Sequence, residues 1–171
     1  MIINTPRLRL RSWQESHRNA FADMHSHLEV MHDYCGVLNR AESDEKLDRY
    51  IATYEQHGYC REAVRTSGER VVIETTVMPV SSSHPLGAHL DIGWRLVRSA
   101  WGQGYATEAA RAALEDAFER VGISEVVAYT AVDNLRSQAV MNRLRLHRDP
   151  SRDFTMDYDF GPWRGMVWVT R

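Results

Sequence analysis

Two glycines, Gly102 and Gly104, stand where an alternating, strand-like segment gives way to a long helical pattern. The first backbone N–H groups of a helix have no intrahelical partner, and the helix dipole favours negative charge there. Glycine lacks the Cβ atom that would keep a phosphate away from the backbone. The junction is therefore suited to hold a pyrophosphate. Taken alone, a Gly-x-Gly turn is more simply interpreted as a tight connection between strand and helix.

Two other nucleotide-binding loops fit these residues less well. The dinucleotide-binding fingerprint requires a third small residue near position 107, where the chain has Thr107. It also requires an acidic residue after the next strand, which ends in Ala131-Val132. A Walker A loop requires Gly-Lys-Ser/Thr, which the sequence lacks. The pyrophosphate of coenzyme A remains the better anion.

A polar pair, Asn134 and Ser137, follows the next predicted strand. The two residues are three positions apart at the start of a helical pattern, so both side chains can face the same side. Asn134 could equally be a helix cap, with Ser137 an ordinary residue of the first turn. The spacing alone leaves both interpretations open.

The periodicity of the N-terminal half predicts the elements around these residues. Residues 7–11 alternate as a half-buried strand does. Ser12 and Glu15 have the spacing of a capping box, so a helix is expected to begin there. A second helix is expected around 47–54, with Gly58 as its stop. The apolar stripe expected on the first helix is Ala20, Phe21, Met24, Leu28 and Met31.

From residue 61 the pattern changes to that of strands. Residues 61–66 and 70–78 predict a hairpin that turns near Ser67-Gly68. Pro79 is expected to end the second strand because it cannot donate to the ladder. Residues 90–97 predict a further strand with one core face, to which Asp91 does not belong.

The second half predicts alternating helices and strands. A helix is expected over 105–121, a buried central strand over 125–132 and a closing strand over 166–170. The helix after Asn134 has an apolar side made by Leu135, Ala139, Val140 and Leu144. The order strand, two helices, three strands, helix, strand, helix, strand predicts an α/β fold, with a mixed sheet flanked by helices in one domain over 1–171.

The composition is that of an ordinary soluble protein. Hydrophobic residues make up 43% of the 171 residues and charged residues 26%. The net charge of −2 gives no basic footprint for nucleic acid. No apolar run suits a signal peptide or a membrane span, so a cytoplasmic protein without a membrane partner is expected.

The cysteines and histidines give no sign of a metal site. Cys35 and Cys60 match no metal or redox motif and are expected to be reduced thiols. His25, His27 and His32 are spaced poorly for metal binding and are expected at the surface. The sequence therefore predicts no metal site.

Four segments together resemble the GNAT superfamily of N-acetyltransferases. Residues 91–96 resemble its fourth strand and residues 101–109 its pyrophosphate loop and helix. The pattern Asn134-x-x-Ser137-x-x-Val140-Met141-x-x-Leu144 resembles the segment after its fifth strand. The opening Thr5-Pro6-Arg7-Leu8-Arg9-Leu10-Arg11 resembles the ribosomal-protein N-terminal (RimJ/RimL-like) branch. The resemblance covers most of the chain and is weakest over 75–90 and 150–165.

The resemblance implies a mostly antiparallel GNAT sheet flanked by helices, with acetyl-CoA as the co-substrate. The backbones of Leu96 and Val97 would pair with the pantetheine arm, and Gly93 would carry a bulge that splays the sheet. Asn134 and Ser137 would contact the cofactor near its thioester. The residues of the implied pyrophosphate loop are Gly102, Gln103, Gly104, Tyr105, Ala106 and Thr107.

The resemblance also implies catalytic roles. Asp91 occupies a position where relatives often carry a carboxylate, and it would take a proton from the amine through water. Asp91 could instead be a solvated strand residue or an ion-pair partner of Arg95. Glu74 is a second candidate base. Met141 stands where many relatives have a tyrosine that protonates the departing thiolate, so Ser137 or water would serve instead.

The implied reaction is transfer of an acetyl group to a primary amine by direct attack. The acceptor would be a protein N-terminus or a small amine, and the same fold acting on an antibiotic or an amino acid is an alternative. A non-catalytic acyl-CoA-binding module is another. Homodimers are common in the branch. Relatives usually have glycine where this chain has Arg145, and Trp163 and Trp168 could line the cleft, a dimer interface or the core.

Overall fold

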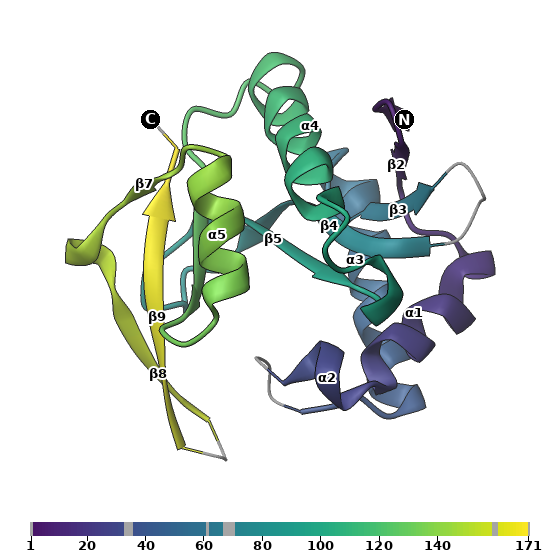
Figure 1. Ribbon diagram of the computed structural model, residues 1–171, viewed down its shortest axis with the longest axis horizontal. Coiled ribbons are helices and arrows are strands. Elements are labelled where there is room, and N and C mark those ends of the chain that lie inside the picture. Colours follow the sequence, from purple (N-terminus) through teal and green to yellow (C-terminus); the bar gives the residue numbers. More distant parts are fainter. Residues whose placement is uncertain (1, 33–35, 61, 67–70, 159–160, 171) are drawn as a thin grey trace.

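The computed structural model describes residues 2–32, 36–60, 62–66, 71–158 and 161–170. Over these ranges nine strands form one mixed sheet in the order β1-β2-β3-β4-β5-β6-β9-β7, with β8 beside β9 (Figure 1). The pairing of β5 with β6 is parallel and the other pairings are antiparallel. The strands are β1 (Ile2–Asn4), β2 (Leu8–Arg11), β3 (Glu62–Thr66), β4 (Val71–Val80), β5 (His89–Leu96), β6 (Val127–Ala131), β7 (His147–Arg148), β8 (Phe154–Tyr158) and β9 (Gly161–Val169). The predicted mixed, mostly antiparallel α/β fold is confirmed.

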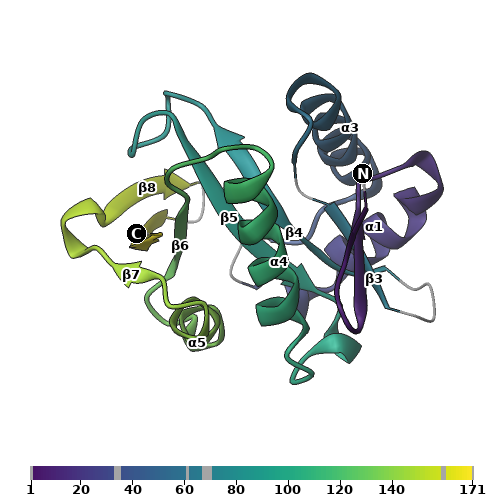
Figure 2. The same ribbon diagram turned by 90° about the horizontal axis from the view of Figure 1, so that it is seen from above.

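Helices cover both faces of the sheet. One face carries α4 and α5, and the other carries α1, α2 and α3 (Figures 1 and 2). Their bounds are α1 (Arg18–Ser26), α2 (Leu28–Met31), α3 (Arg40–His57), α4 (Tyr105–Glu119) and α5 (Leu135–Arg143), with short 3-10 turns at Glu15–His17, Arg98–Ala100 and Pro150–Arg152. None of the helices in the described ranges is both long and apolar enough to cross a membrane.

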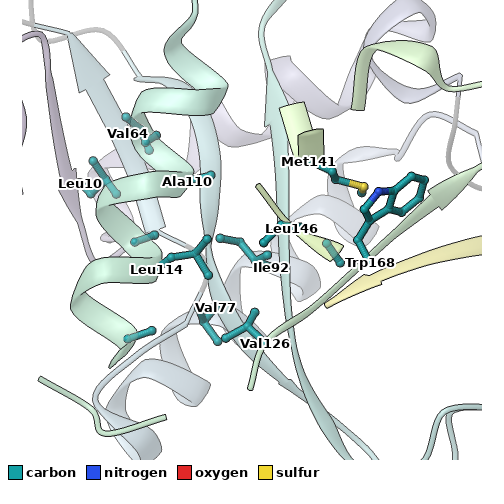
Figure 3. Packing of buried hydrophobic residues seen from close by; sticks show 14 of the residues in the cluster. Leu10, Val64, Val77, Ile92, Ala110, Leu114, Val126, Met141, Leu146 and Trp168 are labelled. Carbon is teal, nitrogen blue, oxygen red and sulfur yellow. The ribbon is translucent and has the colours of Figure 1, made fainter. Parts of the chain in front are cut away.

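The larger core lies between α4 and the sheet (Figure 3). The buried side of α4 is almost entirely alanine, so the helix axis can come close to the strands. Leu10, Val64 and Ile92 fill the space from the sheet side, and Trp168 packs at the far end. The predicted helix over 105–121 and the predicted closing strand are thus both present. The buried alanines of α4 are Ala106, Ala109, Ala110, Ala113 and Ala117.

A second core holds α1 and α3 against the opposite face. Trp13, Phe21, Met24, Leu47 and Tyr50 are buried there. Edge-to-face contacts join the rings: the Trp13 and Phe21 centroids are 4.7 Å apart, and those of Phe21 and Tyr50 are 5.8 Å apart. The second predicted helix is confirmed as α3, and Gly58 ends it at φ 75°, a conformation that glycine adopts without strain.

The predicted start of the first helix is wrong. After β2 the chain makes the 3-10 turn, and α1 begins at Arg18 rather than near Ser12. The capping box forms at Gln14 and His17, where His17 Nδ1 accepts the Gln14 N–H at 3.3 Å. The helix then breaks at His27, so the apolar stripe loses its phase and Leu28 is 71% exposed.

Pro79 does not end its strand as expected. β4 continues to Val80, with Pro79 opposite Leu90 of β5. The register with β3 reaches Thr75, so the later part of β4 pairs along one edge within the described residues. A proline is tolerated where only one edge of a strand is paired. The predicted turn at Ser67-Gly68 lies outside the described residues.

Three strands were not predicted: β1, β7 and β8. The first two contain three and two residues, too few for a visible alternation. β8 pairs with β9 in a hairpin that extends away from the body of the protein (Figure 1). The helix after Asn134 is confirmed as α5, but Leu135 is 71% exposed and does not belong to its apolar side.

Candidate active site

The sheet opens between its two central strands. Within the described ranges β5 and β6 are in register at one point, Asp91 opposite Val127. The strands then diverge and leave a cleft of about 1560 Å³, lined by residues 91–96 of β5 and by the first turns of α4 and α5. The predicted splay is therefore present. Its predicted cause is not, because the β4–β5 register runs through Gly93 without a bulge.

The backbone irregularity at this level lies on the neighbouring strand. Thr76, opposite Gly93, has φ 134°, a backbone conformation that residues other than glycine rarely adopt. Thr75 Oγ1 donates to the Gly93 carbonyl at 2.8 Å, which ties the two strands together there. The unusual backbone conformation at this level is thus on β4 rather than on β5.

The loop before α4 presents backbone N–H groups to the cleft. Gly102 and Gly104 have φ 76° and 77°, so both need the freedom of glycine, and no atom lies within 4 Å of a Cβ built on Gly102. Glu108 N–H donates to Gly104 O at 3.1 Å. The N–H groups of the preceding Tyr105, Ala106 and Thr107 belong to the first turn, which has no intrahelical acceptor. All three residues line the cleft. This geometry fits a pyrophosphate.

Arg7 holds this loop from the N-terminal segment. Its Nε donates to Glu108 Oε2 at 2.6 Å, and its Nη1 donates to the Gln103 carbonyl at 2.9 Å. Thr5 Oγ1 donates to Glu108 Oε1 at 2.6 Å. Burial opposes ionisation of Glu108, but these bonds outweigh it and lower its pKa. Arg7 therefore balances a carboxylate that would otherwise stand next to a bound anion.

Two guanidinium groups enclose the ring of Trp101 beside the loop. The Cζ atoms of Arg98 and Arg136 lie 4.6 and 4.4 Å from the centre of the ring. The indole N–H donates to Leu96 O at 3.0 Å, and Val97 O accepts the Ala100 N–H at 3.0 Å. These two carbonyls thus already have donors, and pairing of the pantetheine arm with Leu96 and Val97 stays a prediction.

Asn134, Ser137 and Met141 come together on α5. Asn134 Oδ1 accepts the Ser137 N–H at 3.0 Å, so Asn134 is the helix cap. The three residues line the cleft, with Met141 buried and Ser137 half-buried. The cap and a cofactor contact are compatible, because the Asn134 amide group keeps its NH₂ donors while its oxygen accepts.

Asp91 is buried in the cleft. The residue is 6% exposed, so the alternative of a solvated strand residue is wrong. Asp91 points to the face opposite Ile92, which is occupied by the α1–α3 layer and by the cleft. Arg95 Nη1 lies 3.7 Å from Glu74 Oε1, within ion-pair distance. The structure thus places Asp91 in the wall of the cleft.

Glu74 belongs to a buried charge cluster with Lys46 and His25. Lys46 Nζ lies 3.4 Å from Glu74 Oε1 and 2.8 Å from His25 Nε2. Burial raises the pKa of Glu74, but Lys46, His25 and Arg95 outweigh it and hold that pKa well below its usual value. Glu74 is therefore a poor base. His25 was expected at the surface, but it is 0% exposed, so that expectation is wrong. Its Nδ1 forms a hydrogen bond with the Phe21 carbonyl at 2.8 Å.

Of the aromatic side chains at the far end of the cleft, the sequence analysis named only Trp163 as a residue that could line it. His84, Tyr129 and Trp163 line the cleft, and Phe154 packs behind them. They come from four separate segments, and three of the four residues lie in the ranges where the resemblance is weakest. No spacing in the sequence could have joined them.

No group of three His, Cys, Asp or Glu side chains within the described ranges is arranged to hold a metal ion. Cys60 is a free, buried thiol, and Cys35 lies outside the described residues.

Known structures share this architecture. An acetyltransferase of the GNAT family from Bacillus anthracis superposes with a TM-score of 0.82 at 21% identity, covering 99% of this chain and 98% of that one. RimL, a ribosomal-protein alpha-N-protein acetyltransferase solved with coenzyme A, has a TM-score of 0.80 at 19% identity, covering 99% and 97%. At these identities the likeness concerns the fold.

Sequence comparison gives a shorter but closer match. The chain is 45% identical over 51 residues to the FsC-acetyl coenzyme A-N(2)-transacetylase of Aspergillus fumigatus, a match over 30% of this chain and 22% of that protein. The acetyltransferase (GNAT) domain family matches residues 7–147. Because this match spans most of the chain, the protein belongs to the acetyltransferase (GNAT) domain family.

Proposed function

We propose that this protein, as one domain over 1–171, transfers an acetyl group from acetyl-CoA to a primary amine by direct attack. The observation that carries the proposal is the opening of the sheet after Asp91, with a glycine loop and a helix N-terminus at one end and a buried carboxylate within it. Acetyl-CoA, when bound, supplies a thioester carbonyl that an amine can attack. The loop over 102–107 would hold its pyrophosphate.

Asp91 would remove the proton that blocks the attack. An α-amine has a pKa of about 7.7–8.0 and a lysine-type amine about 10.4, so most acceptors arrive protonated. Asp91 faces the cleft and can accept that proton directly or through one water. Glu74 is less suited because its neighbours stabilise its ionised form.

The leaving group would obtain its proton elsewhere. Met141 is buried in the cleft wall and has no proton to give. Ser137 is half-buried in the same wall, so its hydroxyl is the nearest candidate donor on α5. A thiolate is a good leaving group near neutral pH because thiol pKa values are about 8.5, so water would also suffice.

The substitution Asp91→Asn tests this assignment. We expect turnover near neutral pH to fall by roughly 100-fold or more, since general base catalysis contributes about 10²–10⁴-fold. The Kd of acetyl-CoA should stay nearly constant, because the loop is untouched. Initial rates of CoA release and calorimetric titration measure the two quantities. Asp23→Asn, an exposed carboxylate on α1, is the matched control.

Unchanged turnover in Asp91→Asn would remove Asp91 from the mechanism. Binding of acetyl-CoA by the wild-type protein without turnover of any amine would instead favour a non-catalytic acyl-CoA-binding module. The two results are separated by testing the wild-type protein first against both peptides and small amines.

A further inference from the structure

One wall of the cleft is aromatic. The Tyr129 ring stacks on His84 with centroids 5.2 Å apart, and both pack edge-on against Phe154, at 5.3 and 4.8 Å. Phe154 in turn contacts Trp163 at 5.7 Å. We call these four residues the aromatic wall. They come from β6, the β4–β5 connection, β8 and β9.

The strand register puts this wall on the same sheet face as Asp91. Neighbouring residues in register point to the same face, and alternate residues along a strand share a face. Asp91 is opposite Val127, and Tyr129 follows two residues later on β6. Tyr129 is opposite Val167, and Trp163 lies four residues before it on β9. The carboxylate and the rings therefore lie on one face of the sheet, opposite the face that α4 covers.

Gly165 makes room for the wall. It lies opposite Phe154, and a Cβ built on it would be 2.7 Å from both the Phe154 and the Trp163 rings. Any side chain at 165 would displace one of them. Because Gly165 has no side chain, the Phe154 and Trp163 rings can both pack directly over this position of the sheet.

The rings remain available to a ligand. The four members of the wall are each half-buried, and His84, Tyr129 and Trp163 line the cleft together with Asp91. Leu86 N–H donates to His84 Nδ1 at 3.1 Å, so in the neutral ring the proton is on Nε2. Burial, and then the neighbouring His89, lower the pKa of His84, while Asp91 opposes this shift. Near neutral pH His84 therefore contributes a flat, uncharged ring.

A flat apolar wall and a carboxylate in one cleft suit a particular kind of acceptor. Aromatic rings stack on one another and bury a large apolar area. An ammonium group is attracted both to a carboxylate and to the faces of aromatic rings. We propose that the acceptor is a primary amine joined by a short linker to an aromatic ring, which packs against the wall while the amine reaches Asp91. This rests on the acetyl transfer proposed above.

The step balances within the cleft. The amine nitrogen bonds to the acetyl carbonyl carbon, and the carbon–sulfur bond breaks. Asp91 takes the first proton from the ammonium group before the attack and later releases it to water. The nitrogen loses a second proton as the amide forms, and the thiolate takes up one proton, so the protons balance. The ring changes none of these bonds, so its effect should appear as selectivity between amines of similar basicity.

A pair of amines tests the selectivity. We expect kcat/KM for 2-phenylethylamine to exceed that for n-butylamine by roughly 10-fold or more, as burial and stacking of one ring would give. Trp163→Ala and Tyr129→Leu should each lower the ratio severalfold, chiefly through KM of the aromatic amine. Tyr59→Ala, which alters a half-buried ring outside the cleft, should leave the ratio unchanged.

Two further arms separate the possible failures. The peptides Phe-Ala-Ala and Ala-Ala-Ala show whether the ring is preferred on a free amine or at a peptide N-terminus. Calorimetric titration of 2-phenylethylamine and n-butylamine into the CoA-saturated protein reports binding without turnover. Equal kcat/KM and equal binding for ring-bearing and ring-free amines would overturn the aromatic acceptor and leave acetyl transfer standing. Selective binding of the ring-bearing amine without turnover would overturn acetyl transfer but would support the aromatic wall as a binding site for the ring.

Discussion

Asp91 and Glu74 show how two buried carboxylates on adjacent strands come to differ. Glu74 lies among Lys46, His25 and Arg95, so its charge is balanced and its proton affinity is low. Asp91 lies at the mouth of the divergence between β5 and β6, where a ligand can approach. Two of the groups around Glu74, His25 and Lys46, come from α1 and α3, and no local sequence pattern around Glu74 indicates them.

A third buried carboxylate, Glu62, should control stability between mild acid and neutral pH. Burial, and then the nearby Asp116, raise its pKa from 4.5 to about 7. Below the unfolded value both states hold the proton. As pH rises through 4.5 the unfolded chain releases it while the folded protein does not, so the free energy of unfolding falls until about pH 7 and then levels off. The loss is about 3 kcal/mol.

Urea unfolding of Glu62→Gln at about pH 5 and about pH 8 measures this effect. The variant should lose most of the decrease between the two values and be more stable than the wild type at the higher one. Glu119→Gln, an exposed carboxylate on α4, should retain the wild-type dependence. Identical pH profiles for Glu62→Gln and the wild type would show that Glu62 titrates normally.

Elements with strong local signals were predictable, and those set by distant partners were not. The alanine stripe of α4 and the end of α3 at Gly58 are both indicated by the spacing of nearby residues, and both are confirmed. The start of α1 depends on a bond between Gln14 and His17 that competes with an equally plausible box at Ser12. β7 contains two residues and exists because β9 is there to pair with it.

The end of α5 explains why glycine is usual at position 145. Arg145 has φ 60°, and the hydrogen bonds Arg145 N–H to Asn142 O and Leu146 N–H to Met141 O, both 3.0 Å, form a Schellman motif. This motif requires a left-handed residue, which costs a side chain roughly 1 kcal/mol or more. The sequence shows that arginine replaces the usual glycine, and the backbone conformation shows that this replacement is strained.

Arg145→Gly should therefore stabilise the protein. We expect a gain of about 1 kcal/mol and a rise in Tm of roughly 2–4 °C, partly offset by the greater freedom of glycine in the unfolded chain. Thermal unfolding followed by circular dichroism measures it. Arg143→Gly, in the last turn of the same helix, should instead be destabilising. A lower Tm for Arg145→Gly would mean that the Arg145 side chain stabilises the fold more than the strain opposes it.

At the scale of the whole molecule, the two ends of the cleft are built from opposite ends of the chain. Arg7 connects the N-terminal segment to the loop over 102–107, and the β8–β9 hairpin supplies two rings of the aromatic wall, Phe154 and Trp163. The loop itself was predictable because its glycines are contiguous with α4. The wall was not, because its rings become neighbours only when the sheet order brings β6 beside β9.

Ligand binding should therefore stabilise the protein through Arg7 as well as through the loop. Acetyl-CoA at 100 times its Kd should raise the free energy of unfolding by about 2.7 kcal/mol, while NAD and ATP should have little effect. Arg7→Ala leaves Glu108 without its positively charged partner beside the phosphate site, so the Tm rise at a fixed acetyl-CoA concentration should shrink. Arg9→Ala, on the exposed side of β2, should keep the full rise. An unchanged rise in Tm in Arg7→Ala would show that the loop binds its anion independently of the N-terminal segment. No rise in Tm in the wild-type protein would show that the loop over 102–107 is only a turn and does not bind acetyl-CoA.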